Sequence, residues 1–225
     1  VVAGILSAGR GSAEAQIQTL DTRGVAELRV DTSSADFIVA YDGGAPDRAL
    51  LETSEGPRQW ELRRDGDALV VESKRVFFFD WFSFGPGTAQ TVILRLPEGL
   101  REQPLDAEFR VSSGGLQVEG GFDELEVDVS SGSAQLSGEA RTLDAELSSG
   151  RLEFSLADVE EVDIRTSSGQ ARGEITGAAP REVEVGVSSG SAELEFPDAS
   201  YAVSTRASSG RIENLLRTDP SSRRT

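Results

Sequence analysis

The feature that most constrains this chain is the tripeptide Ser-Ser-Gly, which recurs at a nearly constant interval through the second half. The six copies begin at Ser112, Ser130, Ser148, Ser167, Ser188 and Ser208. The steps between them are 18, 18, 19, 21 and 20 residues. A period of this length indicates a repeat architecture, in which a unit buries its apolar face only by stacking on its neighbours.

The residues around each tripeptide alternate in polarity. In the second copy Val129, Val127 and Leu125 are apolar, and the residues between them are acidic. This period of two predicts a strand with one buried face. The alternation resumes at Ala134, an odd number of positions after Val129, so the phase changes at the tripeptide. Ser-Ser-Gly is therefore a bend, in which glycine supplies unusual backbone dihedral angles and serine stays small.

These patterns predict an all-β, single-domain parallel β-solenoid, or β-helix. Each coil of 18 to 21 residues is expected to run strand, corner, strand, loop. Equivalent corners at one per coil imply parallel register, with coils about 4.8 Å apart. An antiparallel meander or sandwich is the competing architecture, but it does not require the same tripeptide at every turn.

The first half of the chain holds a disguised seventh copy, in which Ala35 follows Ser33-Ser34 in place of glycine. No Ser-Ser-Gly falls between Ser33 and Ser112. That stretch instead carries a hairpin signal with Asp65-Gly66 at its turn, then an aromatic segment, then the strand-like TVILRLPEGL. We expect an N-terminal insertion or end cap over about 42–100.

The expected domain organisation has three parts. Residues 1–18 are a membrane-proximal segment or linker, 19–216 are the β-solenoid domain with regular repeats over about 105–216, and 217–225 are a polar tail. The chain opens on six apolar-type residues, too few to span a bilayer, which needs about twenty. They are either a frayed terminus or the outer end of a transmembrane helix.

Composition narrows the classes of function. A net charge of −17 disfavours nucleic acid as a partner, because binding a phosphate backbone relies on Lys and Arg. The chain has no histidine and no cysteine, so it lacks the commonest general base, the commonest zinc ligand and thiolate chemistry. We expect no nucleic-acid partner and no cofactor.

One catalytic pattern occurs, because residues 186–190 match the G-x-S-x-G nucleophile elbow. Its Ser188 is one of six equivalent serines, however, and no histidine can activate the hydroxyl. A Ser-Lys arrangement would need Lys74, with no spacing to support it. Acidic residues number 39, which keeps glycoside hydrolysis open, but no cluster stands out. We therefore predict that the chain is not an enzyme.

An acidic residue lies four positions before the first serine in five copies. These residues are Glu108, Glu126, Asp144, Asp163 and Glu184. Parallel register would stack them in one column, where like charges repel. The favoured interpretation is a solvated face, relieved by Arg110, Arg165 and Arg206 in the adjacent column. A calcium-binding edge is the alternative, because calcium prefers oxygen ligands.

A second candidate site is the aromatic segment KRVFFFDWFSFGPG, residues 74–87. Six of the 14 aromatic residues crowd into it: Phe77, Phe78, Phe79, Trp81, Phe82 and Phe84. Exposed together, they would exceed the apolar patch that soluble monomers normally show, so something is expected to cover them. They either cap the solenoid, dip into a membrane interface, or dock a partner or a second copy.

Several segments resemble the bacterial putative-adhesin family, a cell-envelope domain of unknown function. The resemblance rests on the VSSG...L.V.G units, the opening ELRVDTSSADFIVAY, and the hairpin ELRRDGDALVVES followed by a Phe/Trp-rich loop. Actinobacterial members look most similar, since they carry such a loop and often an N-terminal membrane helix. The resemblance covers roughly 19–216. It implies a β-solenoid tethered to the envelope, with no established enzymatic activity.

Residues and resemblance together predict a non-enzymatic, extracytoplasmic interaction or scaffold module of the bacterial cell envelope, anchored by an N-terminal transmembrane segment. The expected partner is an unknown protein or envelope component, with membrane-surface contact and self-association as further possibilities. Two alternatives come from other classes. One is a carbohydrate-active β-helix enzyme, and the other is a structural solenoid that assembles end to end.

Overall fold

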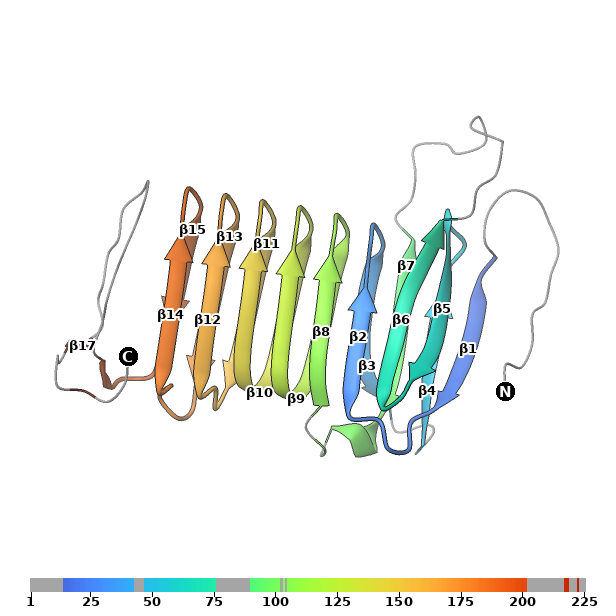
Figure 1. Ribbon diagram of the computed structural model, residues 1–225, viewed down its shortest axis with the longest axis horizontal. Coiled ribbons are helices and arrows are strands. Elements are labelled where there is room, and N and C mark those ends of the chain that lie inside the picture. The colour runs from blue at the N-terminus through green and yellow to red at the C-terminus, as the bar shows by residue number, and fades with distance from the viewer. Residues whose placement is uncertain are drawn as a thin grey trace.

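The computed structural model describes residues 14–42, 47–75, 90–101, 103, 105–201, 217–218 and 222. Within these residues the chain forms a row of stacked coils, seen from the side in Figure 1. Each coil contributes one strand to each of two opposed faces, and the apolar core fills the space between them. The predicted all-β parallel solenoid is confirmed.

The coils are joined by parallel pairing on both faces. On the first face the order is β6 (Ala68–Arg75), β2 (Glu27–Asp31), β8, β9, β10, β12 and β14. On the second face it is β7 (Thr91–Pro97), β3 (Asp36–Asp42), β9, β10, β11, β13 and β15. The strands after residue 100 are β8 (Leu105–Val111), β9 (Gly115–Val129), β10 (Ser133–Leu147), β11 (Arg151–Ala157), β12 (Glu161–Thr166), β13 (Gln170–Thr176), β14 (Glu182–Val187) and β15 (Ser191–Glu195). A short parallel pair, β16 (Ser200–Tyr201) and β17 (Arg217–Thr218), follows them.

The register reproduces the spacing of the tripeptides. Gly115 pairs with Ser133, Ser133 with Arg151, Arg151 with Gln170, and Gln170 with Ser191. Neighbouring coils are therefore offset by 18, 18, 19 and 21 residues, the same steps as in the sequence. Burial alternates along the strands as the polarity pattern predicts.

Close approach between coils explains the glycine of each corner. A Cβ on Gly132 would lie 2.2 Å from the carbonyl oxygen of Gly114, and one on Gly190 would lie 2.1 Å from that of Gly169. The described glycines with positive φ are Gly24, Gly66, Gly138 and Gly177, so no corner glycine is among them. The expectation that unusual dihedral angles require glycine here is wrong, because the requirement comes from the coil beneath.

The opposite corner changes along the solenoid. β9 and β10 each run over both faces as one strand that bends midway, so these coils have no loop there. In β10, Gly138 has a φ of 126° and no room for a Cβ, which would lie 1.9 Å from the carbonyl oxygen of Gly120, so only glycine fits this bend. Later coils do have the expected loop, between β11 and β12 and between β13 and β14.

The first coil of the sequence lies inside the stack. It consists of β2 (Glu27–Asp31) and β3 (Asp36–Asp42), and it pairs in parallel with β8 and β9 on one side. On the other side it pairs with β6 (Ala68–Arg75) and β7 (Thr91–Pro97). The N–H of Ser113 donates to the carbonyl oxygen of Ser33 at 2.8 Å, so residues 80 positions apart in the sequence are neighbours.

Antiparallel strands close the N-terminal end. β5 (Arg58–Asp65) forms the predicted hairpin with β6, and Gly66 in its turn has φ of 66°. β4 (Arg48–Thr53) pairs with β7, and β1 (Gln16–Asp21) pairs with β4. A short 3-10 helix, η1 (Glu98–Leu100), precedes β8. The solenoid therefore ends in antiparallel strands that share none of the Ser-Ser-Gly pattern.

Candidate functional site

The register gathers the five acidic candidates into one column on the first face. Glu108 pairs with Glu126, Glu126 with Asp144, Asp144 with Asp163, and Asp163 with Glu184. This column crosses β8, β9, β10, β12 and β14. Its members stand side by side at the coil spacing, so they do not converge on one point.

Arginines neutralise parts of the acidic column. Arg110 forms an ion pair with Glu108 and approaches Asp128 at 3.7 Å, and Arg165 forms an ion pair with Asp163. The Oδ1 atom of Asp163 is nevertheless buried without a hydrogen-bond partner. Burial raises the pKa of Asp163, and Asp144 and Glu184 raise it further, whereas Arg165 lowers it. The column is thus a charged surface in which one carboxylate, that of Asp163, is partly buried and lacks a hydrogen-bond partner for one oxygen.

The calcium alternative stays a prediction. In the part of the chain that the structure describes, no group of three or more His, Cys, Asp or Glu side chains is arranged to hold a metal ion. Calcium takes six to eight oxygen ligands around one point. A column of single carboxylates, one from each coil, offers a different geometry.

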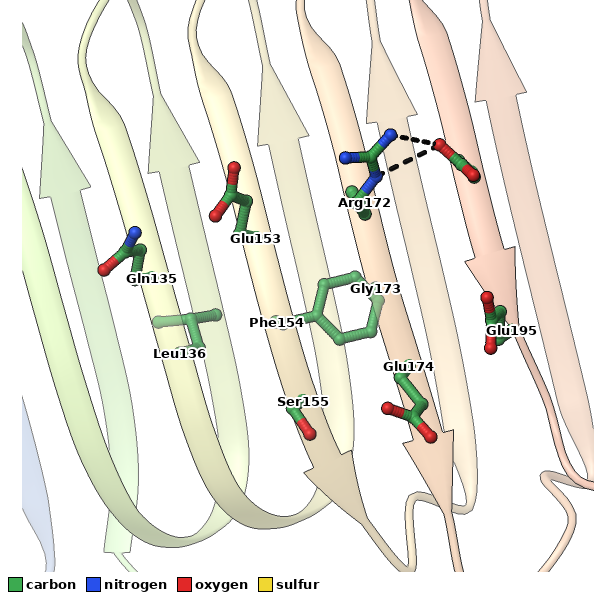
Figure 2. Close-up of a pocket in the computed structure, with 10 residues that line it drawn as sticks. Gln135, Leu136, Glu153, Phe154, Ser155, Arg172, Gly173, Glu174 and Glu195 are labelled. Carbon is green, nitrogen blue, oxygen red and sulfur yellow. Dashed lines mark hydrogen bonds and ion pairs between the residues drawn. The ribbon is translucent and has the colours of Figure 1, made fainter.

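The second face carries a shallow open trough of about 440 Å³ (Figure 2). It crosses β10, β11, β13 and β15, so successive coils contribute equivalent positions. Its lining consists of Gln135, Leu136, Glu153, Phe154, Ser155, Arg172, Gly173, Glu174, Glu193 and Glu195. The polarity pattern does not single out this set, because it joins outward polar residues of separate repeats with three inward residues, Leu136, Phe154 and Gly173.

Polar side chains form one wall of the trough in register. Gln135 pairs with Glu153, Glu153 with Arg172, and Arg172 with Glu193. The Nε and Nη2 atoms of Arg172 donate to Oε2 of Glu193 at 3.0 and 2.5 Å. That hydrogen bond, with the charge of Glu193 and then of Glu153, raises the pKa of Arg172. The wall therefore offers an amide from β10, carboxylates from β11 and β15, and one cation from β13.

A glycine in the buried row shapes the floor. Gly173 pairs with Phe154 of the coil below, and a Cβ on Gly173 would lie 2.0 Å from that ring. Figure 2 shows the Phe154 ring lying toward Gly173. The signal that could have indicated this place is a glycine at an inward position, where the other repeats carry an apolar side chain.

Among the described residues, the structure does not bring the remaining sequence candidates together. The six aromatic candidates, Phe77, Phe78, Phe79, Trp81, Phe82 and Phe84, lie outside the described residues. Ser188 lies at a corner between two strands, β14 and β15, whereas a nucleophile elbow joins a strand to a helix. Lys74 forms an ion pair with Glu61. In the described part of the chain, no helix has the length and apolar character needed to cross a membrane.

The parallel coils, the repeated corner and the antiparallel end define a β-solenoid built from short repeats. The chain belongs to the Toastrack DUF4097 family, whose model matches residues 25–222. This supports the broad resemblance that the repeats indicated. The special likeness to actinobacterial members stays a prediction.

Two solved structures are similar to this chain over most of its length. One is a putative cell adhesion protein from Clostridium sporogenes, with 11% identity, a TM-score of 0.49, and coverage of 81% of this chain and 97% of that one. The other is a putative adhesin from Bacteroides fragilis, with 12% identity, a TM-score of 0.33, and coverage of 80% and 96%. No curated protein matches the chain.

Proposed function

We propose that this chain is a non-catalytic, extracytoplasmic interaction module of the bacterial cell envelope, of the adhesin-like kind. The trough on the second face carries the proposal. It repeats equivalent polar positions from β10 to β15, which suits an extended partner that lies across several coils. A protein segment or an envelope polymer has this shape.

The chemistry of the trough favours a partner rich in hydrogen-bond donors. Glu153, Glu174, Glu193 and Glu195 present carboxylate acceptors, and Arg172 is already bound to Glu193. Ionised carboxylates form stronger hydrogen bonds than neutral acceptors do. Hydroxyl or ammonium groups of an envelope component would therefore be preferred over anions at this face.

Co-sedimentation with insoluble bacterial cell-wall material tests the proposal. The parent chain is expected to sediment with the wall, and the double variant Glu153→Ala/Glu174→Ala is expected to lose most of this binding. Glu124→Ala/Glu182→Ala removes equal charge from exposed positions on the first face and is the matched control. Equal binding by both double variants would contradict a role for the trough.

The same samples separate binding from the carbohydrate-active alternative. Release of reducing sugars by the parent chain, lost in Glu153→Ala/Glu174→Ala, would favour an enzyme that uses the carboxylates of the trough. Binding without release is the expected result.

We further propose that the aromatic segment contacts a membrane surface, a partner or a second copy. The described chain leaves β6 at Arg75 and resumes at Gln90, on the corner edge where Asp36 N–H donates to the Gln90 carbonyl oxygen at 2.9 Å. The variant with Phe77, Phe78, Trp81 and Phe82 changed to Ser is expected to fold and to lose liposome binding or self-association. A large drop in its melting temperature, with a parent that ignores liposomes and stays monomeric, would instead indicate a cap.

A further inference from the structure

The corner of the first coil carries a cluster of one arginine and three serine hydroxyls, separate from the trough and from the acidic column. Arg58, at the start of β5, donates from Nε to the Ser34 hydroxyl at 3.1 Å and from Nη1 to the Ser73 hydroxyl at 3.2 Å. The Ser73 oxygen lies 2.9 Å from that of Ser33. The N–H and hydroxyl of Ser33 both lie within hydrogen-bond distance of Oδ1 of Asp31, at 3.0 and 3.2 Å.

Arg58 differs from the other half-buried arginines that the structure describes. Arg29, Arg63 and Arg95 each form an ion pair with a carboxylate, whereas Arg58 has no carboxylate partner among the described residues. A guanidinium group has five N–H donors. Two of these donors on Arg58 reach serine hydroxyls, and the other three have no partner in the described part of the chain. Other described arginines without an ion pair, such as Arg48 and Arg151, are exposed, whereas Arg58 is half-buried.

We propose that Arg58, with the hydroxyl of Ser34, binds an oxyanion: the carboxylate, sulfate or phosphate group of an acidic ligand. A guanidinium group matches such groups with two parallel hydrogen bonds. The Ser33 hydroxyl donates to Asp31, so the Ser73 hydroxyl is the donor to Ser33. Ser34 is the serine that keeps its hydroxyl proton to donate to a ligand. The cluster therefore offers a charged donor and a neutral donor side by side.

The elements around the cluster hold it in place before a ligand arrives. The carbonyl oxygen of Arg58 accepts from the buried Gln90 side chain at 3.0 Å, and the same Nε2 atom of Gln90 donates to Ser54 at 3.1 Å. Arg58 also pairs with Arg75 across the β5–β6 hairpin. Since the serines come from β6 and from the β2–β3 corner, three segments fix the donors. Because these donors are already held in place, their side chains lose little conformational entropy when a ligand binds.

Exposed serines along the same edge of the solenoid would let the site bind a polymeric ligand. Ser33 stacks on Ser113, and exposed serine pairs continue at the described corners as far as Ser188, held by N–H to carbonyl bonds such as Ser131 to Ser112 at 2.9 Å. An acidic polymer rich in hydroxyls could place its charged group on Arg58 and its hydroxyls along these serines. This site is separate from the trough, so it does not depend on the function proposed above.

Asp31 sets the expected strength of the site. Its carboxylate is linked to Arg58 through Ser33 and Ser73, so it repels an incoming anion. A single oxyanion is therefore expected to bind in the millimolar range. Removing the charge with Asp31→Asn is expected to tighten binding.

Titration with sodium sulfate, phosphate and acetate, at ionic strength matched with sodium chloride, tests the site through melting temperature. The parent chain is expected to show a saturable rise that Arg58→Gln lacks, with an apparent affinity at least about tenfold weaker in the variant. Arg151→Gln removes an equal charge beside a later corner and should behave as the parent does. Sulfate also stabilises proteins without binding, so the difference between variants is the evidence.

An equal response in the parent chain and Arg58→Gln would overturn the proposal, and so would an equal loss in Arg151→Gln. If Arg58→Gln fails to fold, the Nε–H signal of Arg58 in the parent chain gives the answer by NMR. A saturable shift of that signal on sulfate addition supports the site, and an unchanged signal contradicts it. The double variant Ser34→Ala/Ser73→Ala keeps the charge and is expected to weaken the shift.

Discussion

At the scale of single residues, the corner glycines and Asp163 show two ways in which stacking constrains a side chain. The glycines have ordinary φ values but no room, because each Cβ would meet the carbonyl oxygen of the coil below. Asp163 has room, but the register places it between Asp144 and Glu184. Both constraints arise from neighbouring coils, so neither can be seen within one repeat.

Replacing a corner glycine is expected to be costly. Gly132→Ala would place a Cβ 2.2 Å from the Gly114 oxygen, so the two coils must separate. We expect a loss of about 2 to 4 kcal/mol in the free energy of unfolding, measured by urea denaturation. Gly186→Ala is the matched control, since the nearest atom to its Cβ would be 4.0 Å away. Equal effects of the two substitutions would contradict the stacking argument.

Asp163 is expected to make stability depend on pH. Its folded-state pKa is raised by burial and by neighbouring carboxylates, so the ionised side chain costs stability above the raised pKa. This cost falls as the pH decreases through the raised pKa toward the unfolded-state value. Asp163→Asn should therefore raise the melting temperature at pH 7 by a few degrees at most, and the gain should vanish near pH 3 to 4.

Melting curves from pH 3 to 8 check this prediction. Glu124→Gln removes one negative charge from an exposed position on the same face and serves as the control. A gain for Asp163→Asn that stays constant with pH, or that Glu124→Gln matches, would show that the titration of Asp163 is not its cause.

At the scale of elements, the amide side chain of Gln18 links two strands at the N-terminal end by hydrogen bonds to the backbone. The Oε1 atom of Gln18 on β1 accepts from the Leu62 N–H at 3.0 Å, and its Nε2 donates to the Trp60 carbonyl oxygen at 2.7 Å. One amide thus pairs with the backbone of β5 as a neighbouring strand would. This links the end strands of the two faces, β1 and β5.

Removing this amide should weaken the N-terminal end. Gln18→Ala leaves two backbone groups of β5 without their partner, at an expected cost of about 1 to 3 kcal/mol. Hydrogen exchange should show faster exchange at Leu62 and in β1, with little change in β12 to β15. Thr19→Ala, at an exposed position on β1, should leave exchange unchanged. Protection at Leu62 that survives in Gln18→Ala would refute the bridging role.

At the scale of the whole molecule, the solenoid behaves as a stack whose length can be changed in whole coils. Deleting residues 133–150 removes one coil and brings together β9 and β11, which already share the register of β10. We expect a folded protein with the same strand signal per residue by circular dichroism and a lower melting temperature, because one set of interfaces is lost. Deleting residues 133–141 removes only part of a coil and should abolish cooperative unfolding.

The sequence predicts the repeated part of this fold well because each coil carries its own signal. The steps from Ser112 to Ser188 appear unchanged as the register between strands. The place of the first coil could not be predicted in this way. Pairing of β2 with β6 and β8 depends on contacts between distant segments, and no repeat marks them.

The candidate sites were less predictable than the fold. The acidic column could be predicted from the sequence alone, because its members lie at the same position in each repeat and identical positions stack in parallel coils. The trough needs the missing side chain of Gly173 beside Phe154, and the Arg58 cluster needs three segments that the sequence keeps apart. Such sites depend on contacts between segments that are distant in the sequence, and polarity patterns do not predict these contacts.

The interior position of the β2–β3 coil also affects how the chain is made. The ribosome releases β2 and β3 early, and the strands up to Pro97 can cover only one of their two sides. The other side waits for β8 and β9, which end at Val129. At usual rates of translation that delay lasts about 2 to 6 seconds. During this time the growing chain lacks the strands that pair with the free edges of β2 and β3 in the folded protein.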